Sequence, residues 1–167
     1  MADTDDAWKA LLQTNDWIKV ADAKAAATLA ASGVLGTVLV RSAPGQNAWR
    51  QEPWLASLAI LSLILTVIST FVALRVFAPR IRTGEPRSLM YFDHIARRYP
   101  KALDFKHAFI GMLDRDGLMR ESITEQLWAN SRVARRKFKQ VAFAIWSLGG
   151  ALATQVAAGL AHALLGP

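Results

Sequence analysis

An uninterrupted apolar segment at residues 54–74 constrains the fold more than any other part of the chain. It holds no charged side chain and is dominated by leucine, isoleucine and valine. About 20 such residues are enough for a helix to cross the roughly 30 Å hydrocarbon core of a bilayer. Arg75 follows at once, and Pro79 is expected to help end the helix. The segment therefore predicts a transmembrane helix.

Two further blocks without charge lie at residues 25–40 and 141–167. The first is short for a span, but the flanking Lys24 and Arg41 can reach to the bilayer surface and extend it. The chain is 53% hydrophobic and still carries 20 Lys and Arg, and nearly all of its charge lies outside these blocks. We therefore predict an all-α membrane protein with three transmembrane helices, at about residues 25–40, 54–74 and 141–164.

Small residues recur at every fourth position in two of the blocks. Faces of this kind let helices approach closely in lipid, so we expect the spans to pack through them. The two predicted faces are Thr28, Ser32 and Gly36 in the first block, and Gly149, Ala153, Ala157 and Ala161 in the last.

The remaining segments are predicted to be a helical lead, a loop and a soluble region. No Pro or Gly precedes Gly33, so an amphipathic helix is expected to run unbroken into the first span. The loop at residues 42–53 places Trp49 and Trp54 at the depth of an interfacial aromatic belt. The predicted organisation is a cytoplasmic amphipathic helix (1–24), a transmembrane hairpin (25–74), a cytoplasmic helical sensing region (75–140) and a third transmembrane helix (141–164).

Three helices are predicted after residue 87. Ser88 can cap the first, which Pro100 ends, and Asp104 can cap the second. The third starts near Leu118 and meets no stop signal before Gly149, so we expect it to continue into the last span. Its inward stripe is predicted to be Ile123, Leu127, Asn130, Ala134, Phe138 and Val141, with the asparagine setting the register.

The distribution of Lys and Arg predicts the orientation. Residues 1–24 hold three of these side chains, residues 41–53 hold two, and residues 75–140 hold fifteen. With two spans between the first and third segments, 18 basic residues fall on one side and 2 on the other. The positive-inside rule then places the N-terminus in the cytoplasm and the C-terminus outside, in a multi-pass protein of the bacterial inner membrane. Topology thereby accounts for the net charge of +7, so no nucleic-acid partner is expected.

The side chains that usually carry catalysis or bind metals are sparse. The chain has no cysteine, and His94, His107 and His162 each lack a second ligand at metal spacing. No Gly-rich phosphate loop and no serine nucleophile motif occurs. We therefore expect no enzymatic activity, no metal site and no cofactor.

Two basic clusters and one acidic–basic pair are the candidate functional features. Each basic cluster has two interpretations. The cluster at residues 97–101 can bind an anion or be a solvated helix face. The cluster at residues 132–139 can bind a ligand or be a juxtamembrane segment that touches anionic lipid. Asp22 and Lys24 lie at the membrane boundary and either pair with a neighbouring helix or mark the interface. The clusters are Arg97, Arg98 and Lys101, and then Arg132, Arg135, Arg136, Lys137 and Lys139.

Four short stretches of the sequence are distinctive: residues 17–25, residues 90–96, Glu125-Gln126-Leu127 with Ser131, and residues 134–138. The most specific, around Trp17, Asp22 and Lys24, has the pattern W-I-x-x-A-D-x-K-A, and we name it the membrane-boundary motif. Together the four stretches resemble one family, the membrane effectors of the Pycsar antiphage systems. Asp93 departs from the family pattern, in which a small residue, often glycine, is usual.

The resemblance implies a function. An adjacent pyrimidine cyclase makes cyclic UMP or cyclic CMP during infection, and the effector responds by impairing the inner membrane, which leads to abortive infection. A basic region with aromatic rings can supply charge and a stacking surface to such a ligand. We hypothesise that binding between neighbouring protomers promotes a homo-oligomer in contact with membrane lipid. The candidate ligand-binding residues are Tyr91, Phe92, His94, Arg97, Arg98, Lys101, Arg135 and Arg136.

Two other functions remain open from the sequence. The chain can be a structural membrane adaptor that docks a soluble partner through residues 88–140 and senses nothing. It can also be a small channel that is always active, although no predicted span carries an acidic residue and only His162 is a candidate pathway residue. A dye-permeability measurement with the cyclase product separates these functions from the defence effector.

Overall fold

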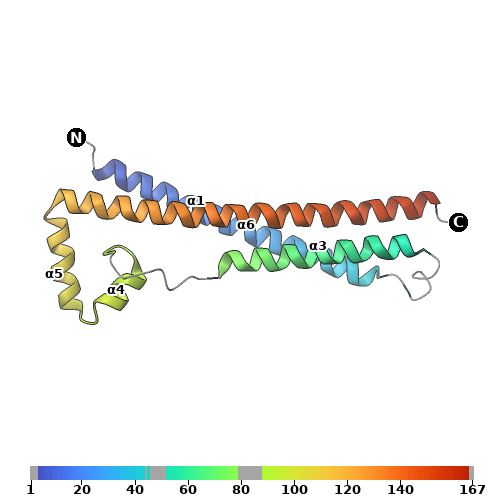
Figure 1. Ribbon diagram of the computed structural model, residues 1–167, viewed down its shortest axis with the longest axis horizontal. Coiled ribbons are helices and arrows are strands. Elements are labelled where there is room, and N and C mark those ends of the chain that lie inside the picture. Colours follow the sequence, from blue (N-terminus) through green and yellow to red (C-terminus); the bar gives the residue numbers. More distant parts are fainter. Residues whose placement is uncertain (1–3, 44, 46–51, 79–87, 166–167) are drawn as a thin grey trace. The chain divides into compact units, whose positions relative to one another are not determined.

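The computed structural model describes residues 4–43, 45, 52–78 and 88–165. The described residues contain no β-strand, which confirms the all-α prediction. Three of their helices are long and apolar enough to cross a membrane, as predicted. In chain order the helices are α1 (Thr4–Arg41), α3 (Pro53–Phe77), α4 (Phe92–Arg98), α5 (Ala102–Leu113) and α6 (Asp116–Leu165) (Figure 1).

The chain divides into two compact units. The first comprises residues 1–20 and 79–136 and is here called the sensing unit, after the role predicted from the sequence. The second, here called the spanning unit, comprises residues 21–78 and 137–167. Helices α1 and α6 each contribute to both units, because neither contains a proline and neither is interrupted between its first and last residue.

The spanning unit buries small and hydroxyl-bearing residues and exposes aliphatic ones. Leu61, Ile64 and Phe71 of α3 are exposed, whereas its buried positions are mostly Ser, Thr and Ala. This inverted pattern is typical of helices that pack against one another in lipid. The buried positions are Ala21, Ala25, Thr28, Ser32, Leu35 and Leu39 of α1, Ala56, Ser62, Thr66, Ser69, Ala73 and Val76 of α3, and Val141, Ala144, Ser147, Leu148 and Ala151 of α6.

Within one chain, only the first of the two predicted small-residue faces is buried. Thr28 and Ser32 are buried as expected, but Gly149, Ala153 and Ala157 of α6 are exposed within the chain. The reason is helical geometry. Positions four apart advance by more than one turn of 3.6 residues, so the row drifts around the helix, whereas alternating steps of three and four stay on one side. The buried positions of all three spans follow the second pattern.

The sensing unit has an aromatic and aliphatic core. Met112 and Ile123 are buried, and the ring of Phe105 lies 5.7 Å from Tyr99 and 5.4 Å from Phe109. Along α6 the predicted stripe faces inward. Its members Ile123, Ala134 and Val141 are buried, and Leu127, Asn130 and Phe138 are half-buried.

Two predicted caps are wrong. The N-cap position is held by Tyr91 in α4 and by Lys101 in α5, not by Ser88 and Asp104 as predicted. Neither Tyr91 nor Lys101 makes a side-chain capping bond. The hydroxyl of Ser88 instead accepts the N–H of Met90 at 3.1 Å. Asp104 lies in the first turn of α5 rather than before it, which still suits the positive end of the helix dipole. Trp49 and Pro79 of the predicted boundaries lie outside the described residues.

Candidate functional site

The short helix α4 and the residues before it bring several of the predicted ligand-binding side chains together. The backbone N–H of Ser88 donates to Nδ1 of His94 at 3.2 Å, which ties the preceding segment to the helix. The ring of Tyr91 lies 5.0 Å from His94, edge to face, and 4.9 Å from Phe92. Nδ1 of His94 is therefore engaged in holding the segment.

Asp93, the position that departs from the resembled family, is buried at 7% exposure. Nη1 of Arg97 donates to its Oδ2 at 3.4 Å, one turn along α4. The distance is long for a charge-assisted hydrogen bond, so the pair is weak. Arg97 keeps 39% of its side chain exposed, and an anionic ligand would compete with Asp93 for it.

Phe92, Arg98 and Lys101 are predicted site residues whose side chains are exposed to solvent. Phe92 exposes 69% of its surface, which is unusual for an aromatic ring in a structured helix. The guanidinium of Arg98 lies over the ring of Tyr99 at 5.4 Å. An exposed ring close in sequence to two cations is an arrangement that suits a ligand with a base and a phosphate.

Arg135 and Arg136 lie on α6, in the same unit, and are exposed. One turn before them, the guanidinium of Arg132 lies 4.9 Å from the ring of Trp128. Trp128 is 63% exposed and was not among the predicted residues. The sequence signal that could have revealed this pair is an aromatic residue four positions before an arginine on a helix.

A chain of amide hydrogen bonds joins three segments of the sensing unit. Nδ2 of Asn130 donates to Oδ1 of Asn15 on α1 at 2.7 Å. Nε2 of Gln126 donates to Oδ1 of Asn130 at 2.8 Å, and the hydroxyl of Ser88 donates to Oε1 of Gln126 at 3.2 Å. The chain therefore connects the segment before α4 to α6 and α1. Sequence patterns indicated Asn130, but not Asn15, its partner.

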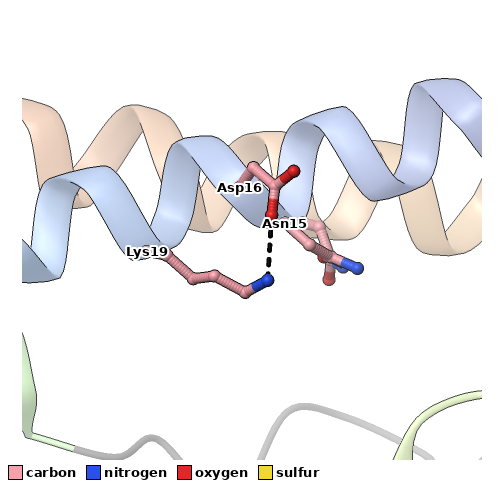
Figure 2. A network of polar contacts seen from close by, with 4 residues as sticks. Asn15, Asp16 and Lys19 are labelled. Carbon is pink, nitrogen blue, oxygen red and sulfur yellow. Dashed lines mark hydrogen bonds and ion pairs between the residues drawn. The ribbon is translucent and has the colours of Figure 1, made fainter.

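Asn15 lies beside a second, exposed polar contact on α1. Figure 2 shows it next to the ion pair of Asp16 and Lys19, whose Nζ lies 2.8 Å from Oδ1 of the aspartate. Both side chains of that pair are more than half exposed, so the pair contributes little to stability.

The membrane-boundary motif contacts another of the four stretches that carry the family resemblance. Nζ of Lys137 donates to Oδ1 of Asp22, and both side chains are partly buried. Nζ of Lys24 lies over the ring of Phe138 at 5.5 Å. These two contacts join α1 to α6 within the spanning unit. Trp17, the first residue of the motif, lies in the sensing unit and is 52% exposed.

The described residues hold no group of three His, Cys, Asp or Glu side chains that could bind a metal ion. A groove between α1 and α3 lies in the spans and is lined by apolar, small and hydroxyl side chains. Because no charged residue lines it, it does not suit a phosphate. Its lining residues are Ser32, Gly33, Gly36, Val40, Leu63, Thr66, Val67, Thr70, Phe71 and Leu74.

Comparisons with known proteins agree with this layout. The sequence model of the Pycsar effector protein domain, PycTM, matches residues 6–165. The Pycsar effector protein PtPycTM of Propioniciclava tarda is 30% identical over 142 residues, which cover 81% of this chain and 68% of that protein. The Pycsar effector protein MePycTM of Micromonospora echinofusca is 55% identical over 42 residues, which cover 25% of this chain and 71% of that protein. No solved structure matches.

Proposed function

Because this chain belongs to the Pycsar effector family, we propose that it is an antiphage effector that responds to cyclic UMP or cyclic CMP by impairing the bacterial inner membrane. A partner pyrimidine cyclase supplies the nucleotide, and loss of membrane integrity leads to abortive infection. The observation that carries the proposal is the family match, which covers both the sensing unit and all three spans. No catalytic step is part of this function.

The proposed topology places the sensing unit where a nucleotide made in the cell reaches it. The N-terminus and residues 75–140 lie in the cytoplasm, and the C-terminus lies outside. The division of 18 basic residues against 2 supports this orientation.

We propose that the surface around α4 receives the nucleotide. The exposed ring of Phe92 stacks on the pyrimidine, and Arg98 and Lys101 attract the cyclic phosphate. Stacking of a base on an aromatic side chain contributes about 1–3 kcal/mol. Arg97 also binds the phosphate if the phosphate displaces Asp93 from its guanidinium. His94 and Tyr91 hold the backbone of the segment before α4 in place.

The response requires two states of the protein with different affinities for the nucleotide. The amide chain at Asn130 and the Asp22–Lys137 ion pair are the contacts most suited to differ between them, because each joins α1 to α6 through polar groups. Nucleotide binding favours the state in which the spans rearrange, and association of several copies stabilises that state.

Binding is tested with the purified protein in detergent, by calorimetry with cyclic UMP, cyclic CMP and, as a control ligand, cyclic AMP. We expect heat with at least one pyrimidine nucleotide. Phe92→Ala should weaken binding about tenfold, the lower part of the range for a lost base stack. The matched control is Lys106→Ala on α5, an exposed cation outside the proposed surface, which should bind as the unmodified protein does.

Membrane impairment is tested with the protein in dye-loaded vesicles. Leakage that starts only when the nucleotide is added supports the effector function. Leakage without nucleotide indicates a channel that is always active, and absence of both binding and leakage indicates the adaptor. Binding that is unchanged in Phe92→Ala moves the nucleotide site away from α4.

A further inference from the structure

Trp146 of α6 is an exposed tryptophan inside a predicted span. The residue is 80% exposed, and within the part of the chain that the structure describes its indole N–H has no hydrogen-bond partner. Tryptophan in membrane proteins is enriched at headgroup level, where its N–H meets water. A donor that faces hydrocarbon without an acceptor costs free energy, so Trp146 needs an acceptor that the single chain does not supply.

Hydrogen bonding between the spans gives the depth of Trp146. Ser69 of α3 donates to the carbonyl oxygen of Ala144 at 2.8 Å, and that carbonyl points along α6 toward Trp146. Trp146 is therefore level with residues 69 and 70 of α3. At 1.5 Å per residue, the last charged side chains before this level lie about 8 Å away on α3 and about 11 Å away on α6. These side chains are Arg75 and Lys139, so Trp146 lies within the hydrocarbon region and not at its edge.

The groove between α1 and α3 offers a hydrogen-bond acceptor at this level. The groove has a volume of about 420 Å³, and all of its lining residues belong to these two helices. Thr70 lines it, and the hydroxyl of Thr70 donates to the carbonyl oxygen of Thr66 at 2.9 Å, which leaves its own oxygen able to accept. Gly33 and Gly36 also line the groove, and there is open space beside each of them. The groove can therefore admit a side chain from outside the bundle.

Trp146 and the groove belong to different surfaces of the spanning unit. Ala144, Leu148 and Ala151 turn the buried side of α6 toward the other spans, and at 3.6 residues per turn Trp146 lies on the opposite side. A second copy with the same orientation in the membrane has its Trp146 at the same depth, level with Thr70 of the first. A lipid acyl chain could fill the groove, but it would leave the indole N–H without an acceptor.

We propose that Trp146 of one copy inserts into the α1–α3 groove of a second copy and donates its indole N–H to the hydroxyl of Thr70. This inference rests on the proposed function, because it identifies the contact through which activated copies associate. The inserted ring and the groove are different surfaces, so each copy contacts two neighbours. Such head-to-tail contacts build a ring or an open row of copies rather than a two-fold dimer.

Cross-linking between two variants tests the geometry, since the chain contains no cysteine of its own. Ala142→Cys and Leu74→Cys lie one helical turn from Trp146 and Thr70, in the same direction across the membrane, and both leave the proposed contact intact. The two variants are mixed in vesicles with cyclic UMP or cyclic CMP and a short bifunctional thiosulfonate. We expect a cross-linked dimer from the mixture and none from either variant alone. Val156→Cys, an exposed position of α6 about 15 Å from Trp146 along the helix, should not cross-link to Leu74→Cys.

Energy transfer between labelled copies in the same vesicles measures how tightly they associate. Trp146→Ala should weaken association by about tenfold or more, as the loss of a buried tryptophan anchor does. Trp146→Phe removes the N–H and Thr70→Val removes the acceptor, and each should weaken association about threefold, the effect of one hydrogen bond between helices in lipid. The two changes together should weaken it no more than the second bond-breaking change adds to the lost ring edge, because they remove the same bond. Thr37→Val, at an exposed threonine of α1 that does not line the groove, is the matched control and should leave association unchanged.

Cross-linking of Ala142→Cys to itself indicates a two-fold contact between α6 helices and overturns the proposal. Unchanged association of Trp146→Ala also overturns it and assigns the groove to a lipid acyl chain. Either result, together with a leak that depends on the nucleotide, leaves the proposed function standing. A cross-link between Ala142→Cys and Leu74→Cys in vesicles that leak with neither nucleotide supports the contact and overturns the proposed function.

Discussion

The two units of this protein bury opposite kinds of side chain. The sensing unit encloses Met112 and Ile123 and leaves its cations outside, as a domain in water does. The spanning unit encloses Ser62 and Ser69 and leaves Ile64 and its aliphatic neighbours outside. The same helices, α1 and α6, take part in both arrangements, so the difference does not come from separate chains or separate folds.

The difference shows which force holds each unit together. Burial of apolar surface is the force that stabilises a unit in water, which is the environment proposed for the sensing unit. Between helices in lipid that force is absent, and close van der Waals contact and interhelical hydrogen bonds take its place. The same kind of substitution should therefore lower the stability of the protein by different amounts in the two units. Each of the following measurements tests that contrast.

Ile123→Ala should give the largest effect. Ile123 is completely buried in the sensing unit, and removing three carbons leaves a cavity in a core that depends on apolar burial. We expect the free energy of unfolding in detergent to fall by about 3 kcal/mol. The control Ile110→Ala, at a 43% exposed position on α5, should lose much less. Equal losses at the two positions would show that the sensing unit has no apolar core.

Ser69→Leu should give the second largest loss of stability, although leucine is more apolar than serine. Its position is fully enclosed between the spans, so the larger side chain forces the helices apart. Overpacking of this kind costs about 2 kcal/mol. Ile68→Leu, on the outer side of α3, should be nearly neutral. Thermal unfolding in detergent measures both, and stabilisation by Ser69→Leu would contradict the inverted pattern.

Asn130→Ala tests the polar part of the sensing unit. The change removes the bonds to Gln126 and Asn15, and Gln126 keeps its bond from the hydroxyl of Ser88. Because the site is half-buried, water replaces part of the loss, and we expect a cost of about 1 kcal/mol. Ser131→Ala, at an exposed neighbour whose hydroxyl bonds only its own helix, is the control. A cost as small as that of the control would make the amide chain irrelevant to stability.

Two of the ion pairs that involve α1 should show the smallest difference. A double-mutant cycle on Asp22 and Lys137, which are partly buried, should give a coupling of about 1 kcal/mol. The same cycle on Asp16 and Lys19, which are largely exposed, should give none that can be measured. Added salt should leave the first coupling nearly intact, because partly buried pairs are screened less. A larger coupling at the exposed pair would reverse the comparison.

The helices themselves could be predicted from local patterns. The charge-free segment at 54–74 predicted α3 (Pro53–Phe77), and the absence of a stop signal predicted that α6 continues without interruption to Leu165. The cap at Ser88 could not be predicted, because its hydroxyl oxygen accepts the N–H of Met90 before the helix begins at Phe92. Local propensity does not reveal such a competition.

The candidate site was only partly visible in the sequence. Phe92, Arg98 and Lys101 were selected as an aromatic residue and cations close together, and the structure places all three at the surface. His94 was selected on the same grounds, yet it holds the backbone of Ser88. Whether a polar side chain faces a ligand or a neighbouring backbone group depends on what lies opposite it, and that is decided by packing.

The sequence by itself determined that this is an all-α chain with three helices able to cross a membrane. Length and apolarity are properties of one segment at a time. The tertiary structure alone decided which face of each span is buried. The row of small side chains at every fourth position of α6 did not predict the buried face of that helix. Such a row drifts around the helix and therefore cannot stay against one neighbouring helix. The tertiary structure also brought together Asp22 with Lys137 and Asn15 with Asn130, pairs 115 positions apart that no local pattern joins.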